Sequence, residues 1–292
     1  MFRWTVLLLA PFACIAAQFS IRTDNVLLNA SVQSPTGGYV TGLKKANFRV
    51  LDDGRAVTIQ HFAASDTPVT VGLIVDNSGS MRQKKVEVVM AGLWFARTSN
   101  PSDEFFVVNF NSHVYSALPR GVAFTDKLQL LRSALYLGNP IGETALYDAV
   151  LAGLDHLKEG HRDIRVLIVV SDGGDNASHI SFSQLTKEIE ASHATIYTIG
   201  LLDPLDRDLN PRVLRKMSQL SGGEFFEPET QGDIKGVFTK ISHDIRNRYV
   251  LGFVPNYAHD PRTLHKLRVE ARDDSGRKLL VHARTAFLSS HE

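Results

Sequence analysis

The sequence predicts an α/β protein with a doubly wound, mostly parallel sheet flanked by helices, joined to a small β-sandwich. Two observations predict this fold class. Between residues 68 and 248, apolar runs of strand length alternate with helical patterns, as in parallel sheets that are covered on both faces. On either side of this region, short segments with a period of two are separated by turn residues. With 292 residues, 43% of them apolar, the chain can bury one large core or two smaller ones.

The first residues have the pattern of an export signal. Arg3 precedes an apolar run over residues 4–10, and small residues follow, so cleavage is expected near Ala16 or Ala17. We therefore expect a signal peptide over residues 1–17 and an exported product, either periplasmic or secreted. A buried first strand is the alternative interpretation of the same apolar run.

Neither a membrane span nor a disulfide is expected. Pro11 and the shortness of the apolar run disfavour a transmembrane helix, which needs roughly 20 apolar residues, and no other segment offers a transmembrane anchor. Cys14 is the only cysteine. It would be the lipidated first residue of a lipoprotein, but Pro11-Phe12-Ala13 is a poor match to the Leu-Ala-Gly type of sequence before such a cysteine. An exported chain without Cys14 has no disulfide framework, so packing and metal must stabilise it.

Charge excludes one class of partner. The chain has 32 Lys and Arg residues against 31 Asp and Glu residues, and it has no basic run. A nucleic-acid partner is therefore not expected.

Residues 18–67 are expected to form an N-terminal segment of short strands. Strand patterns occur at 26–32, 48–51 and 57–62. The last two are separated by Asp52-Asp53-Gly54-Arg55, which is a hairpin signal.

Residues 68–248 are expected to form the α/β domain. Its strands are predicted at 69–75, 105–110, 165–170 and 196–199, and its helices at 86–94, 128–135, 146–157, 183–191, 213–220 and 234–249. The first helix shows apolar residues at helical spacing, which we interpret as its core face: Val86, Val89, Met90, Leu93 and Trp94.

Residues 249–292 return to a strand pattern, with strands predicted at 249–254, 265–272 and 278–287. Neither strand-rich end is long enough to close a sandwich alone. We therefore expect the segment 249–292 to pack with 18–67 as one sandwich, with the α/β domain inserted between them.

Oxygen-bearing side chains follow or precede the predicted elements of the α/β domain at three places. The five candidate metal ligands are Asp76, Ser78, Ser80, Thr144 and Asp172. Ligands of open α/β sheets bind beyond the carboxyl ends of the strands, where these loops should meet. The absence of paired Cys or His near them favours Mg²⁺, with Mn²⁺ or Ca²⁺ as alternatives.

The ligand charges indicate a mechanism. The two carboxylates only just neutralise a divalent ion, because the three hydroxyls carry no charge. An open coordination position of the ion can therefore accept a carboxylate from a partner Asp or Glu. Each loop alone has a simpler interpretation, because Thr144 is a common type of helix N-cap and Asp172-Gly173-Gly174 a common type of turn. The three loops in this order are more specific than any one of them.

The three loops resemble a known site. Asp76-Asn77-Ser78-Gly79-Ser80, the Thr144 loop and Ser171-Asp172-Gly173-Gly174 are similar to the metal-ion-dependent adhesion site of von Willebrand factor type A domains. The resemblance covers roughly 68–248. It implies a mainly parallel sheet flanked by helices and an intact site, with Asp76, Ser78, Ser80 and Thr144 as ligands and Asp172 often acting through water.

The flanking segments resemble the secreted bacterial "VWFA-related" proteins common in acidobacteria. The resemblance rests on residues 42–50, 59–62 and 248–253 and on the later strands. Asn47 stands where we would expect Asp. That family implies no particular ligand.

Other constellations are weaker. The eleven histidines are scattered without the spacing of a zinc site. Asp203, Asp206 and Asp208 suggest Ca²⁺, but Pro204 and a missing glycine break the EF-hand pattern, so a solvated loop is the expected interpretation. Ser78 lacks the Gly-x-Ser-x-Gly context of a nucleophile. A phosphatase is a further alternative, because Asp76 follows a strand as the nucleophilic aspartate does in haloacid-dehalogenase-like phosphatases. Those enzymes have a second Asp two residues later, where this chain has Ser78.

The sequence thus predicts an exported, non-enzymatic adhesion module that binds a carboxylate of a protein or glycan ligand through Mg²⁺. The alternative is a structural, self-assembling envelope module in which the metal only stabilises the fold. The oligomeric state, the ligand and any conformational switching are left open.

Overall fold

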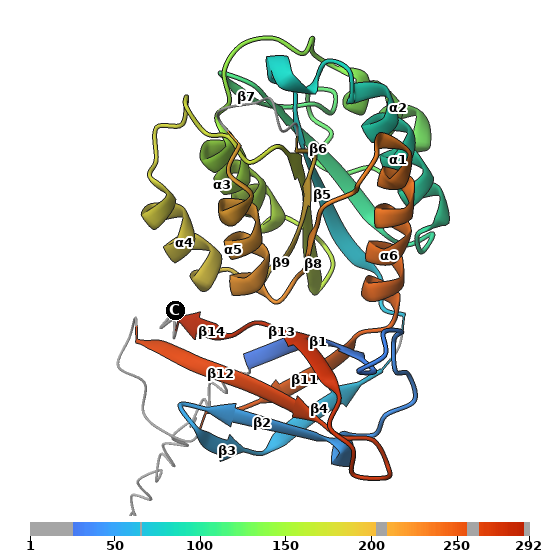
Figure 1. Cartoon of the computed structure of the whole chain (residues 1–292), viewed down its shortest axis with the longest axis vertical. Coiled ribbons are helices and arrows are strands. Elements are labelled where there is room, and N and C mark those ends of the chain that lie inside the picture. The colour runs from blue at the N-terminus through green and yellow to red at the C-terminus, as the bar shows by residue number, and fades with distance from the viewer. Residues whose placement is uncertain (1–25, 65, 203–208, 256–262, 289–292) are drawn as a thin grey trace, which may run out of the picture.

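The computed structural model describes residues 26–64, 66–202, 209–255 and 263–288, and it shows an α/β part stacked on an antiparallel β part (Figure 1). The predicted signal peptide with Cys14, and the predicted loop with Asp203, Asp206 and Asp208, lie outside the described residues. Within the described residues, no helix is long and apolar enough to cross a membrane.

The α/β part is built on a six-stranded sheet in the order β10-β9-β8-β5-β6-β7. The strands are β5 (Val69–Asp76), β6 (Glu104–Phe110), β7 (Val114–Ser116), β8 (Ile164–Ser171), β9 (Thr195–Gly200) and β10 (Phe225–Phe226). All neighbours are parallel except β7, which pairs antiparallel with β6 at one edge. Every residue of β5 is buried, which is why its sequence is continuously apolar rather than alternating.

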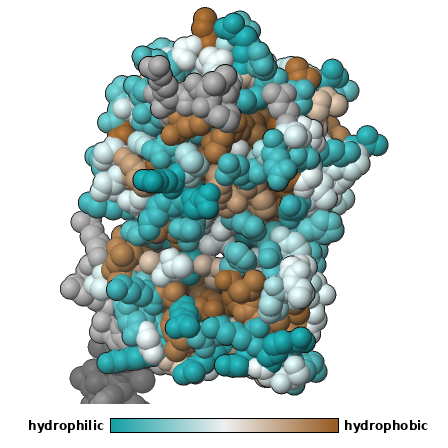
Figure 2. Space-filling model, viewed as in Figure 1, coloured by the Kyte–Doolittle hydropathy of each residue, from teal (hydrophilic) through white to brown (hydrophobic). Residues whose placement is uncertain are grey.

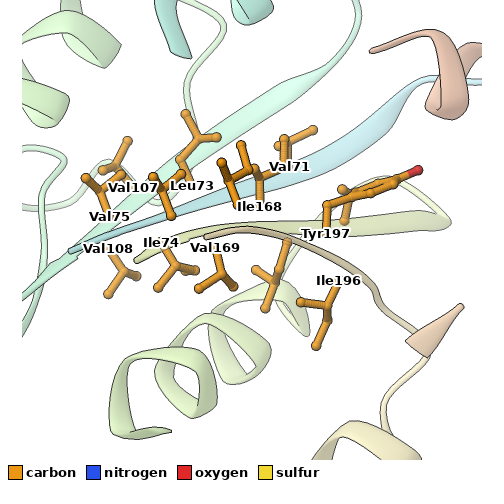
Figure 3. Packing of buried hydrophobic residues seen from close by; sticks show 14 of the residues in the cluster. Val71, Leu73, Ile74, Val75, Val107, Val108, Ile168, Val169, Ile196 and Tyr197 are labelled. Carbon is orange, nitrogen blue, oxygen red and sulfur yellow. The ribbon is translucent and has the colours of Figure 1, made fainter. Parts of the chain in front are cut away.

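Helices cover both faces of this sheet, as expected of a doubly wound fold. They are α1 (Lys85–Thr98), α2 (Leu128–Tyr136), α3 (Leu146–Leu157), α4 (Phe182–Ala191), α5 (Pro211–Ser221) and α6 (Ile234–Arg246). In Figure 1, α1, α2 and α6 lie on one face, and α3, α4 and α5 lie on the other. Figure 3 shows the consequence for the strands, because Leu73 and Ile74 of β5 point to opposite faces and both are buried.

The predicted core face of α1 is wrong at Val86, Met90 and Trp94, although the helix itself is present and Leu93 packs partly buried against the core. Val89 is buried, but Val86, Met90 and Trp94 are 56%, 58% and 38% exposed. The buried residues are Val88, Val89, Ala91, Gly92 and Phe95. The helix turns Gly92 inward because a residue without a side chain allows close approach: a Cβ there would lie 3.3 Å from the Leu135 side chain of α2 and 3.8 Å from the Leu73 side chain of β5. Several brown side chains therefore reach the surface of the molecule (Figure 2).

The β part consists of two four-stranded antiparallel sheets. One has the order β13-β1-β11-β4, with β13 (Leu280–Ala283), β1 (Val26–Gln33), β11 (Tyr249–Phe253) and β4 (Ile59–Ala63). The other has the order β14-β12-β2-β3, with β14 (Ala286–Leu288), β12 (Leu264–Ala271), β2 (Phe48–Asp52) and β3 (Arg55–Val57). Leu28 and Leu251 of the first sheet share one buried cluster with Val50 and Leu267 of the second. Each sheet combines strands from before and after the α/β part, as predicted for a sandwich.

The last predicted strand, 278–287, is wrong as a single element. The chain forms β13 in one sheet, bends at Arg284 and Thr285, and continues as β14 in the other sheet. The buried Arg284 guanidinium holds this bend, because it donates hydrogen bonds to the carbonyl oxygens of Ala286 (2.9 Å) and Glu190 (2.8 Å). The bend closes the sandwich against α4.

A buried ion pair joins the end of α6 to the sheet at the junction of the two parts. Arg248 Nη2 lies 2.8 Å from Asp244 Oδ2, and both side chains are almost fully buried. Arg248 Nη1 also donates to Thr195 Oγ1 at 2.7 Å, and the Tyr197 hydroxyl donates to Asp244. A buried pair of this kind is costly to break by removing one partner, so it fixes where the chain leaves α6 for β11.

Candidate metal centre

Three loops meet beyond the carboxyl edge of the central strands. Asp76 is the last residue of β5, Asp172 directly follows β8, and Thr144 lies two residues before α3. The loop after β5 continues into the short 3-10 helix η2 (Gly79–Met81), which carries Ser80. Because β5 and β8 are adjacent and parallel, their carboxyl ends bring Asp76 and Asp172 to the same place.

Asp76 is held by hydrogen bonds at both carboxylate oxygens. The backbone N–H of Ser78 donates to Oδ1 at 2.8 Å, and the Ser171 hydroxyl donates to Oδ2 at 2.7 Å. The side chain is 1% exposed. The carboxylate therefore has one orientation and is shielded from water.

Ser78, Ser80 and Asp172 form one hydrogen-bonded chain. The hydroxyls of Ser78 and Ser80 lie 3.1 Å apart, and the Ser80 hydroxyl donates to Asp172 Oδ2 at 2.5 Å. The backbone N–H of Gly174 donates to Asp172 Oδ1 at 3.1 Å. The structure thus brings four of the five predicted ligands into a single cluster.

Thr144 joins this cluster through main-chain contacts. Its N–H donates to Asn176 Oδ1 at 2.8 Å, and its carbonyl oxygen accepts from Asn176 N at 3.0 Å. The carbonyl oxygen of Gly142 accepts from Gly79 N at 3.2 Å. The Thr144 loop is therefore tied both to the loop after β8 and to the loop after β5.

Two supporting residues, Ser171 and Asn176, were not predicted to have a role. Both lie inside the quoted Ser171-Asp172-Gly173-Gly174-Asp175-Asn176 stretch. The Ser171 hydroxyl donates to Asp76, and the Asn176 side chain accepts from Thr144 N, so both side chains reach a neighbouring loop and local pattern alone did not reveal them.

The electrostatics of the cluster call for a positive charge. Burial, and then repulsion from Asp172, raise the pKa of Asp76 to about 7. Within the described part of the chain, no ion pair joins Asp76 or Asp172 to a Lys, Arg or His side chain. Lys84 is nearby in sequence, but its ammonium donates to the Leu201 carbonyl oxygen at 2.6 Å.

The donor set fits a hard divalent cation. Two carboxylates and three hydroxyls supply only oxygen ligands, as Mg²⁺ prefers. A divalent ion would neutralise two carboxylates that otherwise repel each other in a buried place. A cavity of about 540 Å³ lies beside this cluster and is lined in part by Gly79, Ser80 and Arg82, which leaves room for a partner's side chain.

Comparisons with known proteins agree with this architecture. A model of the von Willebrand factor type A domain family matches residues 71–240. No curated protein sequence matches the chain.

Several solved structures share the fold at low identity. A von Willebrand factor type A protein from Catenulispora acidiphila is 13% identical, with a TM-score of 0.55, covering 92% of this chain and 74% of that one. The vWF domain of the type V pili tip protein Mfa5 from Porphyromonas gingivalis is 13% identical, with a TM-score of 0.52, covering 63% and 96%. The pilus adhesin SpaC from Lactobacillus rhamnosus GG is 10% identical, with a TM-score of 0.50, covering 87% and 49%. At these identities the likeness shows the fold alone.

Proposed function

The chain belongs to the von Willebrand factor type A domain family, and on that premise we propose that it is an exported, non-enzymatic adhesion module. In this proposal a Mg²⁺ ion is held by Asp76, Ser78, Ser80 and Thr144, with Asp172 acting through water. The bound ion supplies an electron-poor position that takes up a carboxylate of a protein or glycan ligand. Mn²⁺ and Ca²⁺ are the alternatives for the ion.

One observation carries the proposal: two buried carboxylates and the hydroxyls of Ser78 and Ser80 form one hydrogen-bonded oxygen cluster. Among the described residues, no Lys, Arg or His side chain forms an ion pair with its carboxylates. The pilus tip protein and pilus adhesin among the structural neighbours support a role in adhesion. Ser78 in place of a second aspartate disfavours the phosphatase alternative, because phosphoryl transfer of that kind needs both carboxylates.

The metal site is tested by thermal unfolding of the full chain in EDTA and in Mg²⁺. Metal that binds only the folded state at about 100 times its dissociation constant should add about 2.7 kcal/mol to the free energy of unfolding. Asp76→Ala should abolish this increment. Asp126→Ala, at an exposed carboxylate away from the three loops, should retain it. A Mg²⁺ increment that survives in Asp76→Ala would refute the assigned site.

Adhesion is tested separately, with an immobilised peptide that contains a single aspartate and the same peptide with asparagine. We expect the chain to be retained only on the aspartate peptide and only in Mg²⁺. Stabilisation by Mg²⁺ together with metal-independent self-association and no retention on either peptide would favour the structural alternative instead.

A further inference from the structure

A second group of carboxylates lies in the β-sandwich, away from the three loops. Asp52 ends β2, and Asp53 and Gly54 form the two-residue turn to β3, since Asp52 pairs with Arg55. Both turn residues have positive φ, 47° and 80°, as this tight hairpin requires. The turn therefore places two successive carboxylates beside strand β12.

Strand β12 fixes the second carboxylate. Asp53 N donates to the Lys266 carbonyl oxygen at 2.9 Å, and Lys266 N donates back to Asp53 Oδ1 at 2.9 Å. The neighbouring His265 stacks its ring on Phe287, with centroids 4.8 Å apart and planes 18° apart. Its orientation is thereby set toward the carboxylates.

Three ligand atoms converge at this place. His265 Nδ1 lies 3.0 Å from Asp53 Oδ2 and 3.3 Å from Asp52 Oδ1, and one ligand atom from each residue lies within 4.8 Å of the others. Metal–ligand bonds of about 2.0–2.2 Å place the ligand atoms of a tetrahedral site roughly 3.3–3.6 Å apart. The distance from His265 to Asp52 falls in this range, and the distance to Asp53 is a few tenths of an ångström shorter and is also that of a hydrogen bond.

Asp52 is the independent observation that points to a ligand. Its side chain is fully buried, and among the described residues neither carboxylate oxygen accepts a hydrogen bond. Buried charges are normally paired and hydrogen-bonded or coordinate a metal. The group carries two negative charges against at most one positive charge on the imidazole, so the imidazole alone leaves it unbalanced.

We propose that Asp52, Asp53 and His265 form a second metal site, which takes a divalent ion that accepts imidazole, such as Zn²⁺. A divalent ion with neutral His265 would balance the two carboxylates. The nitrogen ligand separates this site from the all-oxygen cluster around Asp76, because imidazole suits Zn²⁺ better than Mg²⁺. The Asp53 side chain is 46% exposed, so the ion can enter from solvent at that side. The bound ion would fasten the β2–β3 hairpin to β12.

The test is a calorimetric titration of the metal-stripped full chain with Zn²⁺ at pH 7.5. Asp53→Asn is the informative variant, because Asn tolerates positive φ and keeps the oxygen that accepts from Lys266 N. We expect the wild type to bind one more equivalent of Zn²⁺ than Asp53→Asn. Asp76→Ala should keep the equivalent that Asp53→Asn loses, which makes the result independent of the site proposed for Mg²⁺.

Asp274→Asn is the matched control, since it removes an exposed carboxylate from another turn of the same sandwich. It should bind Zn²⁺ as the wild type does, and thermal unfolding in EDTA checks that both variants are folded. Long-range ¹H–¹⁵N spectra provide a second measurement, in which saturating Zn²⁺ should shift the Nδ1 signal of His265. Equal Zn²⁺ stoichiometry in the wild type and Asp53→Asn, with His265 Nδ1 still protonated in Zn²⁺, would show an ion pair instead and overturn the proposal.

Discussion

The molecule has two clusters in which a pair of carboxylates lies close together, and the clusters differ in the groups that lie next to these carboxylates. At the edge of the α/β sheet, Asp76 and Asp172 are buried together without a cationic side chain in the described structure, and the pKa of Asp76 is raised to about 7. In the sandwich, Asp52 and Asp53 have an imidazole 3.3 Å and 3.0 Å away, and backbone hydrogen bonding from Lys266 lowers the pKa of Asp53. The first cluster requires a proton or a metal, whereas the second has an imidazole nitrogen within reach of both carboxylates.

The difference distinguishes a cluster that needs a bound ion from a cluster in which a protein side chain already lies beside the carboxylates. Removing a charge should relieve the first cluster when it is metal-free, because its carboxylates repel each other. Removal of the imidazole should instead harm the second cluster, because it takes away the group next to the buried Asp52 carboxylate.

The pH dependence of metal-free stability should show the strain at Asp76. In EDTA, the pKa of Asp76 is about 7 in the folded state against 3.8 for an unperturbed aspartate, so the folded state binds more protons than the unfolded state between these pH values. Stability should therefore fall as pH rises from about 4 to about 7, by about 4 kcal/mol from this residue. The measurement is urea unfolding of the wild type and of Asp76→Asn across this range. The difference between the two curves isolates Asp76, and parallel curves would contradict the prediction.

Removal of one member should have opposite effects on stability in the two clusters. In EDTA at pH 8, His265→Leu removes the imidazole that lies 3.3 Å from the buried Asp52 carboxylate and should cost about 3 kcal/mol. Asp172→Asn should instead stabilise the metal-free protein by about 1 kcal/mol, because it ends the repulsion with Asp76 while keeping an acceptor for Gly174 N. Urea unfolding of both variants checks the signs. Destabilisation by both would remove the contrast.

Loss of a single hydroxyl should have the smallest effect. Thr144→Val keeps the shape of the side chain but removes its oxygen, so Mg²⁺ should bind about tenfold more weakly, which is about 1.4 kcal/mol. Thr144→Ser, which keeps the hydroxyl, should bind Mg²⁺ nearly as the wild type does. Calorimetric titration with Mg²⁺ distinguishes the two variants. Equal weakening by both would mean that the backbone, not the hydroxyl, is what Thr144 contributes.

The sequence predicted the first cluster because each of its parts is local. Asp76, Ser78 and Ser80 lie in one short stretch after β5, and Asp172 follows the adjacent parallel strand β8, so the sheet brings these four residues together. Their assignment as metal ligands remains a prediction. The sequence did not predict the second cluster because Asp53 and His265 are 212 positions apart. Their contact depends on the register of β2 on β12, in which Asp52 faces Leu267.

The fold class was predicted correctly, but two finer features were not. Helix α1 carries two overlapping apolar stripes, and periodicity alone favoured the one with the larger side chains. The sheet instead took the stripe containing Ala91 and Gly92, since small residues allow closer packing. The bend between β13 and β14 depends on Arg284, whose partners Glu190 and Ala286 are fixed only by tertiary structure. The expected domain boundaries remain predictions.

The interleaving of the sandwich strands also sets an order in time. Strand β1 pairs with β11 and β13, and β4 pairs with β11, so Val26 meets Phe253 only after the whole α/β part has been synthesised. The α/β part, whose paired strands are close in sequence by comparison, can complete its sheet earlier. Until β11 and β13 have been synthesised, β1 and β4 have unpaired strand edges, which are prone to pair with other chains. Strands β11 and β13, which follow the α/β part in the chain, therefore complete the pairing of β1 and β4, which precede it.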